Sequence, residues 1–186
     1  MANSTSANLK LTVQATAENS GTWGQITNTN LLILEQAIGG YDAVALNATT
    51  GVTLTFSNGV LSNGKNQVLK LTGTITSNVD VVIPDGIEKT YTVENATTGT
   101  FTVTFKTSSG TGAIWSTTDK GTKLLYSDGT NIVDLNANIN TINQFTLPTS
   151  TGVNGQAMVT DGSGNLSFQG PFTTAGKAIA FSLILG

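Results

Sequence analysis

The hydrophobic positions change their spacing along the chain. Near the start, apolar residues recur every three to five positions, which is the spacing of an amphipathic helix, and we predict a helix over residues 23–38. Thr22 and Gln25 have the spacing of a capping box, and Gly39-Gly40 provides a stop. The run Thr27-Asn28-Thr29-Asn30 is made of poor helix formers, so we expect an interruption near Asn30. The apolar stripe of this predicted helix is formed by Trp23, Ile26, Leu31, Leu34 and Ile38.

The predicted helix has two interpretations. A single apolar stripe is what a helix needs to cover one face of a sheet. The same stripe also serves as a docking element for another protein. The sequence leaves both interpretations open, and we assign residues 1–42 to an N-terminal docking arm and helix.

From residue 43 to residue 135 the apolar period becomes two. Segments such as Val52-Thr-Leu-Thr-Phe56 and Phe101-Thr-Val-Thr-Phe105 alternate apolar and polar residues, as half-buried strands do. Turn pairs such as Asp85-Gly86 and Asp128-Gly129 separate them. Short strands at this spacing with no second helix predict an antiparallel β-sandwich, jelly-roll-like, or a small barrel, with seven to nine strands.

The polar face of these strands is mostly threonine. Threonine satisfies the strand preference through its β-branch and carries a neutral hydroxyl that a neighbouring chain can bury at low desolvation cost. Monomeric proteins tend to protect their sheets with charge instead. This composition fits a sheet that contacts other chains, and it equally fits an ordinary extracellular β-domain.

Residues 136–186 read as a linker followed by an oligomerisation segment. Gln156–Thr160 and Leu166–Phe168 can pair as a hairpin around Asp161-Gly-Ser-Gly164, but so short a hairpin is unstable alone in water. The end, Gly176–Gly186, is the most apolar part of the chain and would aggregate if exposed. We therefore expect a buried strand there, in the chain's own sheet or in a sheet completed by another subunit. The predicted interface residues are Val159, Leu166, Phe168, Ile179, Phe181, Leu183 and Leu185.

The amino-acid composition argues against several classes of function. The 186 residues contain no histidine and no cysteine, which removes most nucleophile and base pairs, zinc sites and disulfides. With 8 basic and 11 acidic residues, the chain offers no basic stripe for a phosphate backbone, so we expect no nucleic-acid partner. It has no signal-peptide pattern and no apolar run near the roughly 20 residues of a membrane span, so we expect no membrane insertion and synthesis in a cytoplasm.

Candidate chemistry is sparse. The carboxylates are scattered, and nothing in the sequence pairs two of them at the separation a glycosidase needs. Asp161-Gly-Ser-Gly-Asn165 lacks the third acidic position and the distal glutamate of a calcium loop, so it is better explained as a turn. We expect no catalytic residues, no metal and no cofactor. Trp115 and Tyr126 are the candidate contacts for a sugar ring, although such residues more often lie in a core or a subunit interface.

Three segments resemble bacteriophage proteins. Thr146–Phe168 is similar to the "LPTsdGtnGQvLkTDGsGnLsW" segment of tail fibres and related virion appendages, with Phe168 in place of the usual Trp and Met158 where Leu is commoner. Glu18–Ile38 is similar to the "NsGtWGxxxNxN" opening of short phage structural proteins. Gly176–Gly186 is similar to the "GKaIAmaivFG" tails of marine phage proteins. Together these matches cover about a third of the chain.

The resemblance implies a trimeric, β-rich virion component. The expected function is that of a non-enzymatic homotrimer, a fibre-like appendage or attachment protein of tail or head. The alternatives are a capsid decoration or cement trimer and a glycan-binding host-recognition module. The implied partners are further copies of the chain, other virion proteins of tail or capsid and, for the last alternative, a host surface glycan.

Overall fold

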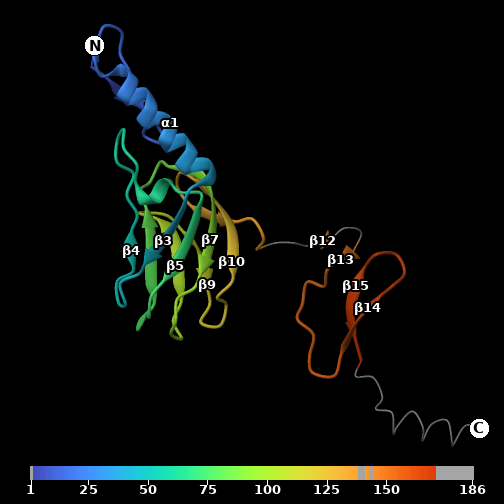
Figure 1. Ribbon diagram of the computed structural model, residues 1–186. Coiled ribbons are helices and arrows are strands. Elements are labelled where there is room, and N and C mark those ends of the chain that lie inside the picture. The colour runs from blue at the N-terminus through green and yellow to red at the C-terminus, as the bar shows by residue number, and fades with distance from the viewer. Residues whose placement is uncertain (1, 138–140, 143–144, 171–186) are drawn as a thin grey trace, which may run out of the picture. The chain divides into compact units, whose positions relative to one another are not determined.

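The computed structural model describes residues 2–137, 141–142 and 145–170. The chain divides into two compact units, residues 1–136 and residues 137–186 (Figure 1). Both units are built mainly from strands, and the first also contains one α-helix. The chain is therefore mainly β, as its alternating pattern predicts.

The first unit contains an N-terminal arm, a helix and two sheets. The arm pairs β1 (Ser4–Thr5) with β2 (Thr12–Val13), and the helix α1 spans Trp23–Gly39. One sheet has the order β11-β10-β7-β5-β3 and the other has the order β4-β6-β8-β9. The strands of these two sheets are β3 (Tyr41–Ala45), β4 (Val52–Thr53), β5 (Val68–Thr72), β6 (Val79–Ile83), β7 (Glu88–Asn95), β8 (Val103–Thr107), β9 (Gly112–Trp115), β10 (Thr122–Asp128) and β11 (Ile132–Asp134).

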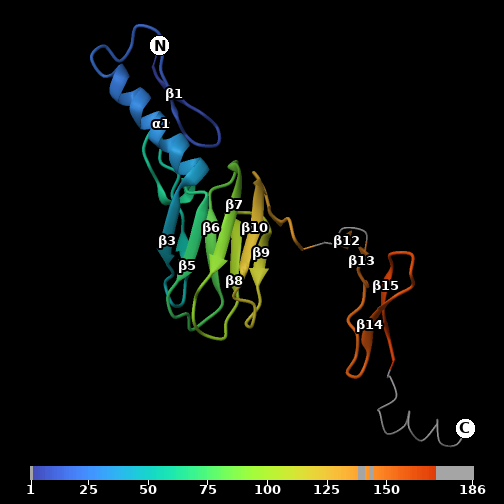
Figure 2. The same cartoon turned by 45° about the vertical axis from the view of Figure 1, so that its right-hand side comes forward.

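The expected antiparallel pairing is wrong for much of both sheets. Neighbours β3, β5 and β7 pair in parallel in the first sheet, and β4, β6 and β8 do so in the second (Figure 2). The chain therefore alternates between the sheets from β3 to β8, and each circuit adds one strand to each sheet. Antiparallel pairs occur only towards the end, with β9 on β8, β10 on β7 and β11 on β10. A jelly roll has only antiparallel neighbours, so that expectation is corrected.

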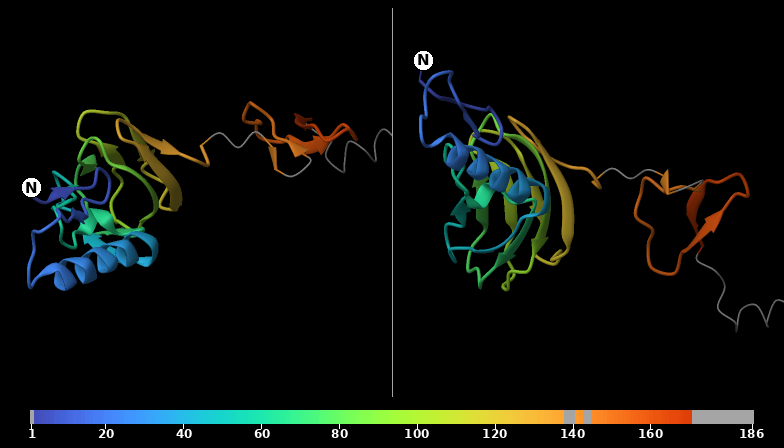
Figure 3. Two further views of the ribbon diagram at one scale, coloured as in Figure 1. Left: turned by 90° about the horizontal axis from the view of Figure 1, so that it is seen from above. Right: turned by 45° about the horizontal axis from the view of Figure 1, so that its top comes forward.

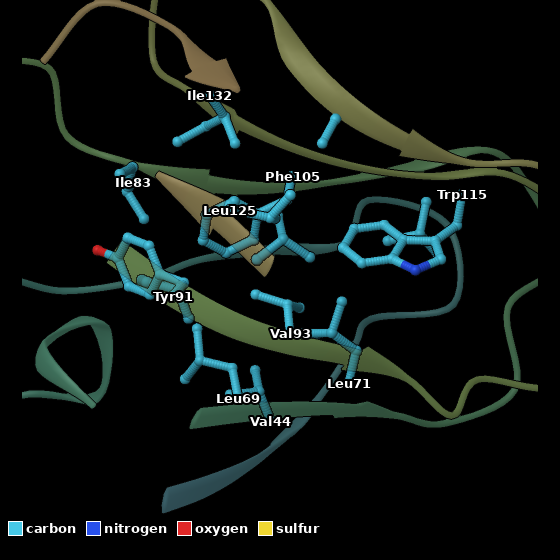
Figure 4. Close-up of a cluster of buried hydrophobic side chains, with 14 of the residues drawn as sticks. Val44, Leu69, Leu71, Ile83, Tyr91, Val93, Phe105, Trp115, Leu125 and Ile132 are labelled. Atoms are coloured by element: carbon cyan, nitrogen blue, oxygen red, sulfur yellow. The ribbon is translucent and has the colours of Figure 1, made fainter. Parts of the chain in front are cut away.

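Side chains from both sheets meet in one core. Tyr91 on β7 and Phe105 on β8 pack with their ring centroids 5.2 Å apart, and both are fully buried (Figure 4). Trp115 on β9 is also fully buried, and its Nε1 donates to Gly121 O at 2.8 Å. Burial of aromatic side chains supplies a large share of core stabilisation. The first unit therefore has a hydrophobic core of its own.

A repeated corner explains the parallel stacking. The sequence Asn-Ala-Thr-Thr-Gly occurs at Asn47–Gly51 and again at Asn95–Gly99, each time followed by alternating apolar residues. In both copies the asparagine Oδ1 accepts from the backbone N–H two residues later, at 3.0 and 3.1 Å. The final glycine has a positive φ in both, 73° and 102°, which glycine adopts without strain. Both corners turn the chain in the same direction. The strands that follow them, β4 and β8, are therefore parallel within their sheet.

The helix begins and ends as predicted but is not interrupted. It is continuous through Asn30, and the hydroxyls of Thr27 and Thr29 donate to the carbonyls four residues earlier, at 2.9 and 3.0 Å. The capping box does not form, since Thr22 makes no side-chain cap. Instead Trp23 N donates to Asn19 O at 2.9 Å.

A second unit follows the first. It contains β12 (Thr141–Ile142) paired with β13 (Phe145–Thr146), and β14 (Ala157–Thr160) paired with β15 (Leu166–Gln169). Thr146 N donates to Gly164 O at 2.7 Å, which ties β13 to the loop between β14 and β15. The predicted boundary near residue 136 coincides with the division between the units.

Candidate assembly surfaces

The apolar stripe of α1 faces solvent. Trp23 is 65% exposed and Ile38 is 78% exposed, while Leu31 and Leu34 are also exposed and Ile26 is half-buried. The fully buried residue of the helix is Ile33, which lies outside the predicted stripe. The helix lies beyond the strand ends and does not cover the face of either sheet (Figures 1 and 3). The interpretation of α1 as a cover for a sheet is therefore wrong.

The polar residues of α1 hold the N-terminal arm. Asn30 Oδ1 accepts from Thr12 N at 2.9 Å, and Asn30 Nδ2 donates to Thr12 O at 2.8 Å. Gln14 Nε2 donates to Thr27 Oγ1 at 3.0 Å. At the other end of the arm, Asn3 and Asn19 exchange amide hydrogen bonds of 2.7 and 2.9 Å. Thr27 and Asn30 have low helix propensity, yet their side chains hold the arm against the helix. The apolar stripe of α1 remains exposed.

A lysine organises the loop beside α1. Lys65 is fully buried, and its Nζ donates to Ser57 O at 2.7 Å and to Val60 O at 2.6 Å. Burial, together with the nearby charge of Lys10, lowers the pKa of Lys65. The loop that Lys65 holds presents Val60 and Leu61, both about half exposed, to solvent. A buried ammonium group is costly unless it is hydrogen-bonded, so its two carbonyl partners fix the shape of this apolar loop.

A groove lies between this loop, the end of α1 and the start of β3. Two adjoining cavities of about 390 and 370 Å³ share Gln36, Tyr41, Leu61 and Asn66 as lining residues. Leu32 and Leu61 supply apolar walls, and the charged lining residues are the carboxylates Glu35 and Asp42. The groove therefore combines an apolar surface with negative charge.

Close packing keeps the groove in shape. A Cβ at Gly40 would lie 2.3 Å from Gln36 O and 2.5 Å from Asn66 Oδ1, so only glycine fits there. Ser62 N donates to Gln36 Oε1 at 3.4 Å, and Asn66 Nδ2 donates to Asn63 O at 3.0 Å. These contacts hold the walls together before any partner binds.

A second lysine joins α1 to the sheet. Lys89 Nζ on β7 donates to Gln67 Oε1 at 3.0 Å and to Ala37 O in the last turn of α1 at 3.5 Å. The ammonium group also lies 4.6 Å from the centre of the Tyr91 ring. A cation near the carbonyl end of a helix is favourable, whereas burial lowers the pKa of Lys89 to about 8.

The hairpin of the second unit forms as predicted, and its register divides the predicted interface residues between its two faces. Its register pairs Met158 with Phe168 and Thr160 with Leu166, while Val159 lies opposite Ser167. Because side chains alternate between the two faces, Val159 lies on the other face from Leu166 and Phe168. The predicted interface residues of the hairpin therefore form two surfaces.

Asp161 explains the turn between β14 and β15. Its Oδ1 accepts from Ser163 N at 2.7 Å and from Asn165 N at 3.1 Å, and its Oδ2 accepts from Asn165 Nδ2 at 2.6 Å. These hydrogen bonds lower the pKa of Asp161. The carboxylate is used by the turn itself, as predicted.

No side chain at residues 145–170 of the second unit is buried. Phe145 and Met158 are about half exposed, Val153 is 69% exposed, and Leu166 and Phe168 are half-buried. The Phe168 ring packs against Gly152, where an added Cβ would lie 2.5 Å from the ring. An isolated hairpin without a covered apolar face is marginal in water, so the described residues 145–170 leave apolar surface uncovered.

The candidate sugar contacts are not brought together as an open surface. Trp115 is fully buried in the core, which makes its ring inaccessible to a sugar and corrects that expectation. Tyr126 is half-buried on β10. The remaining predicted interface residues, Ile179, Phe181, Leu183 and Leu185, lie outside the described residues.

Neither the groove nor the two equal corners at residues 47–51 and 95–99 were predicted from the sequence. The second occurrence of Asn-Ala-Thr-Thr-Gly was the signal for the corners. No comparable signal marked the groove, because its walls come from three segments that only the fold brings together.

Comparison with known proteins gives no relatives to argue from. No protein-family model, curated protein sequence or solved structure matches the chain. Within the described ranges, no three residues among the acidic side chains gather as a metal site would require. No α-helix in the described part of the chain has the length and apolarity to cross a bilayer.

Proposed function

We propose that this chain is a non-enzymatic structural component of a bacteriophage virion, which works as a homotrimer in a fibre-like appendage or attachment protein of tail or head. The observation that carries the proposal is that residues 145–170 of the second unit bury no side chain. Its strands pair, yet none of its described side chains is buried. Several copies that close a shared core would bury them.

The apolar stripe of α1 supports the same proposal. A docked arm and a rigid helix present Trp23, Leu31, Leu34 and Ile38 with no cover from the described part of the chain. Contiguous exposed apolar surface of this kind marks interaction sites. In the proposed particle, α1 contacts another virion protein, and the two-sheet body acts as a rigid β-sandwich that carries this contact.

The decisive experiment is the mass of the full-length protein by light scattering after size-exclusion chromatography, at several concentrations. A trimer has three times the chain mass of 19.2 kDa. The variant Phe168→Asp removes an apolar contact and adds a buried charge, so it should dissociate the trimer. Ser163→Asp adds the same charge at the exposed turn and serves as its control.

A monomer at every concentration would refute the homotrimer. Equal effects of the two variants would show that charge alone weakens assembly and would remove the apolar contact as its cause. If the trimer is found, an antibody against the chain separates the appendage from the decoration protein, because it labels either the tail or the capsid surface of intact particles.

A further inference from the structure

The strand β3 has an unused row of backbone groups. Gly40 O accepts from Val68 N, and Leu46 N donates to Thr72 O, both at 2.9 Å. The even-numbered residues at this end of the sheet therefore direct their backbone groups towards β5. Because this direction alternates along a strand, the N–H and C=O groups of Tyr41, Ala43 and Ala45 point away from β5. β3 is the last strand of its sheet, and no described segment pairs with that side.

This edge lacks the usual protection against pairing. Exposed edges are commonly blunted by lysine, proline, a bulge or a covering loop. β3 contains no lysine and no proline, and Tyr41, Ala43 and Ala45 are exposed. At the other end of the same sheet, β11 is short, with three residues. The open edge of β3 is therefore the better template for an added strand.

The groove continues this edge. Tyr41 and Asp42 belong to β3 and also line the cavities beside α1. A strand added to β3 would extend into the groove, where Leu32 and Leu61 can contact one of its apolar side chains. In strand addition the main-chain hydrogen bonds provide affinity, and side-chain pockets provide specificity.

One segment of this chain has the sequence that such a site requires. Residues 171–186 lie outside the described residues, and in their sequence Lys177 precedes an alternating run. A basic residue followed by apolar residues at every second position complements a groove whose charges are the carboxylates of Glu35 and Asp42. The alternating apolar residues of that run are Ile179, Phe181, Leu183 and Leu185.

We propose that residues 177–185 of a neighbouring copy add as a strand to the free edge of β3, with Lys177 beside the carboxylates of the groove. The inference rests on the proposed homo-oligomer and names the contact that closes it. An exchange in which each chain gives a strand to the next is heterologous, so it forms a closed ring when the rotation closes. Three copies close such a ring as a trimer.

Disulfide trapping in the full-length chain tests the contact. The chain has no cysteine, so an introduced pair has no background. Ala43→Cys or Ala45→Cys is combined with Ala180→Cys, because a disulfide needs Cβ atoms about 3.5 to 4.5 Å apart. At least one pair should give linked dimers and trimers on a non-reducing gel after mild oxidation. The control pair replaces the β3 cysteine by Ser116→Cys, in an exposed loop.

Two results of the trapping experiment would overturn the proposal. Links that form within single chains would show that the segment completes its own sheet. Links with Ser116→Cys as abundant as those with the β3 cysteines would show random collision.

A proline variant tests the backbone hydrogen bonds. Ala43→Pro removes an N–H that points to the free side and leaves the bonds to β5 in place, and proline is tolerated on an edge strand. We expect the trimer of Ala43→Pro to dissociate at a concentration at least about tenfold higher than that of the Ala43→Ser control. For a trimer this is about a hundredfold change in the dissociation constant, or about 2.8 kcal/mol over the three contacts. Unchanged circular dichroism would show that the variant folds.

The results of these experiments distinguish a failure of the β3 contact from a failure of the proposed homotrimer. A trimer without links to β3 and without an effect of Ala43→Pro overturns the edge contact and leaves the homotrimer standing. A monomeric chain overturns both.

Discussion

Asn30 allows a quantitative test of how the arm is fastened. Its side-chain amide makes two hydrogen bonds to the backbone of Thr12, at 2.9 and 2.8 Å. Each neutral hydrogen bond contributes about 0.5 to 1.5 kcal/mol. Asn30→Ala should therefore make local opening of the arm easier by about 1 to 3 kcal/mol. At 1.4 kcal/mol for each factor of ten, this is about a 5- to 150-fold change in the opening equilibrium.

The helix itself should respond in the opposite direction. Alanine is the better helix former by roughly 0.7 kcal/mol, so amide exchange in the middle of α1 should stay the same or slow down. Hydrogen exchange read by NMR resolves the two effects, because it reports the opening of each region separately. The amide of Thr12, which donates to Asn30 Oδ1, and that of Ser6, which donates to Leu11 O within the arm, should exchange faster.

Asn28 supplies the matched control. It lies on the exposed side of the same helix, two residues from Asn30. Asn28→Ala makes the same chemical change and should leave the arm protected. Equal arm protection in both variants, or faster exchange throughout the molecule in Asn30→Ala, would refute the assignment of Asn30 as the fastener.

Further predictions concern the core, the corner and the lysine at the end of the helix. Leu71 is fully buried, so Leu71→Ala should lower the free energy of unfolding in urea by about 2 to 5 kcal/mol, and a loss below 1 kcal/mol would contradict the core assignment. An added Cβ at Gly51 would lie 1.9 Å from Asp80 O at a φ of 73°. Gly51→Ala should therefore cost more in the same assay than Gly21→Ala, which carries the same backbone strain of about 1 to 2 kcal/mol at a φ of 81° but meets nothing within 4 Å. The pKa of Lys89 is about 8 in the folded chain and 10.5 when unperturbed, so the folded state holds fewer protons between these values. Stability should rise between pH 8 and pH 9.5, and a Lys89→Met variant should lose this rise.

Features of short range follow from the sequence alone. The helix over 23–38 and the turn at Asp161 were predicted correctly, and the alternation predicted over Phe101–Phe105 is found in β8, which begins two residues later at Val103. Each depends on residues within a few positions of one another, where hydrophobic period and turn chemistry act directly. The lack of histidine and cysteine likewise belongs to the sequence.

Long-range pairing was decided only by the tertiary structure. An alternating strand buries the same face beside a parallel or an antiparallel neighbour, so its pattern does not reveal the direction of β5 relative to β7. The side of α1 that is buried also depends on the arm, because the hydrogen bonds of Asn30 draw the polar side inward and leave Leu31 and Ile38 outside. The register of the hairpin likewise places Val159 on the face opposite Phe168, and the segment bounds alone did not specify that register. Local pattern fixes which residues alternate, and only contacts between distant segments choose the partner, direction and face.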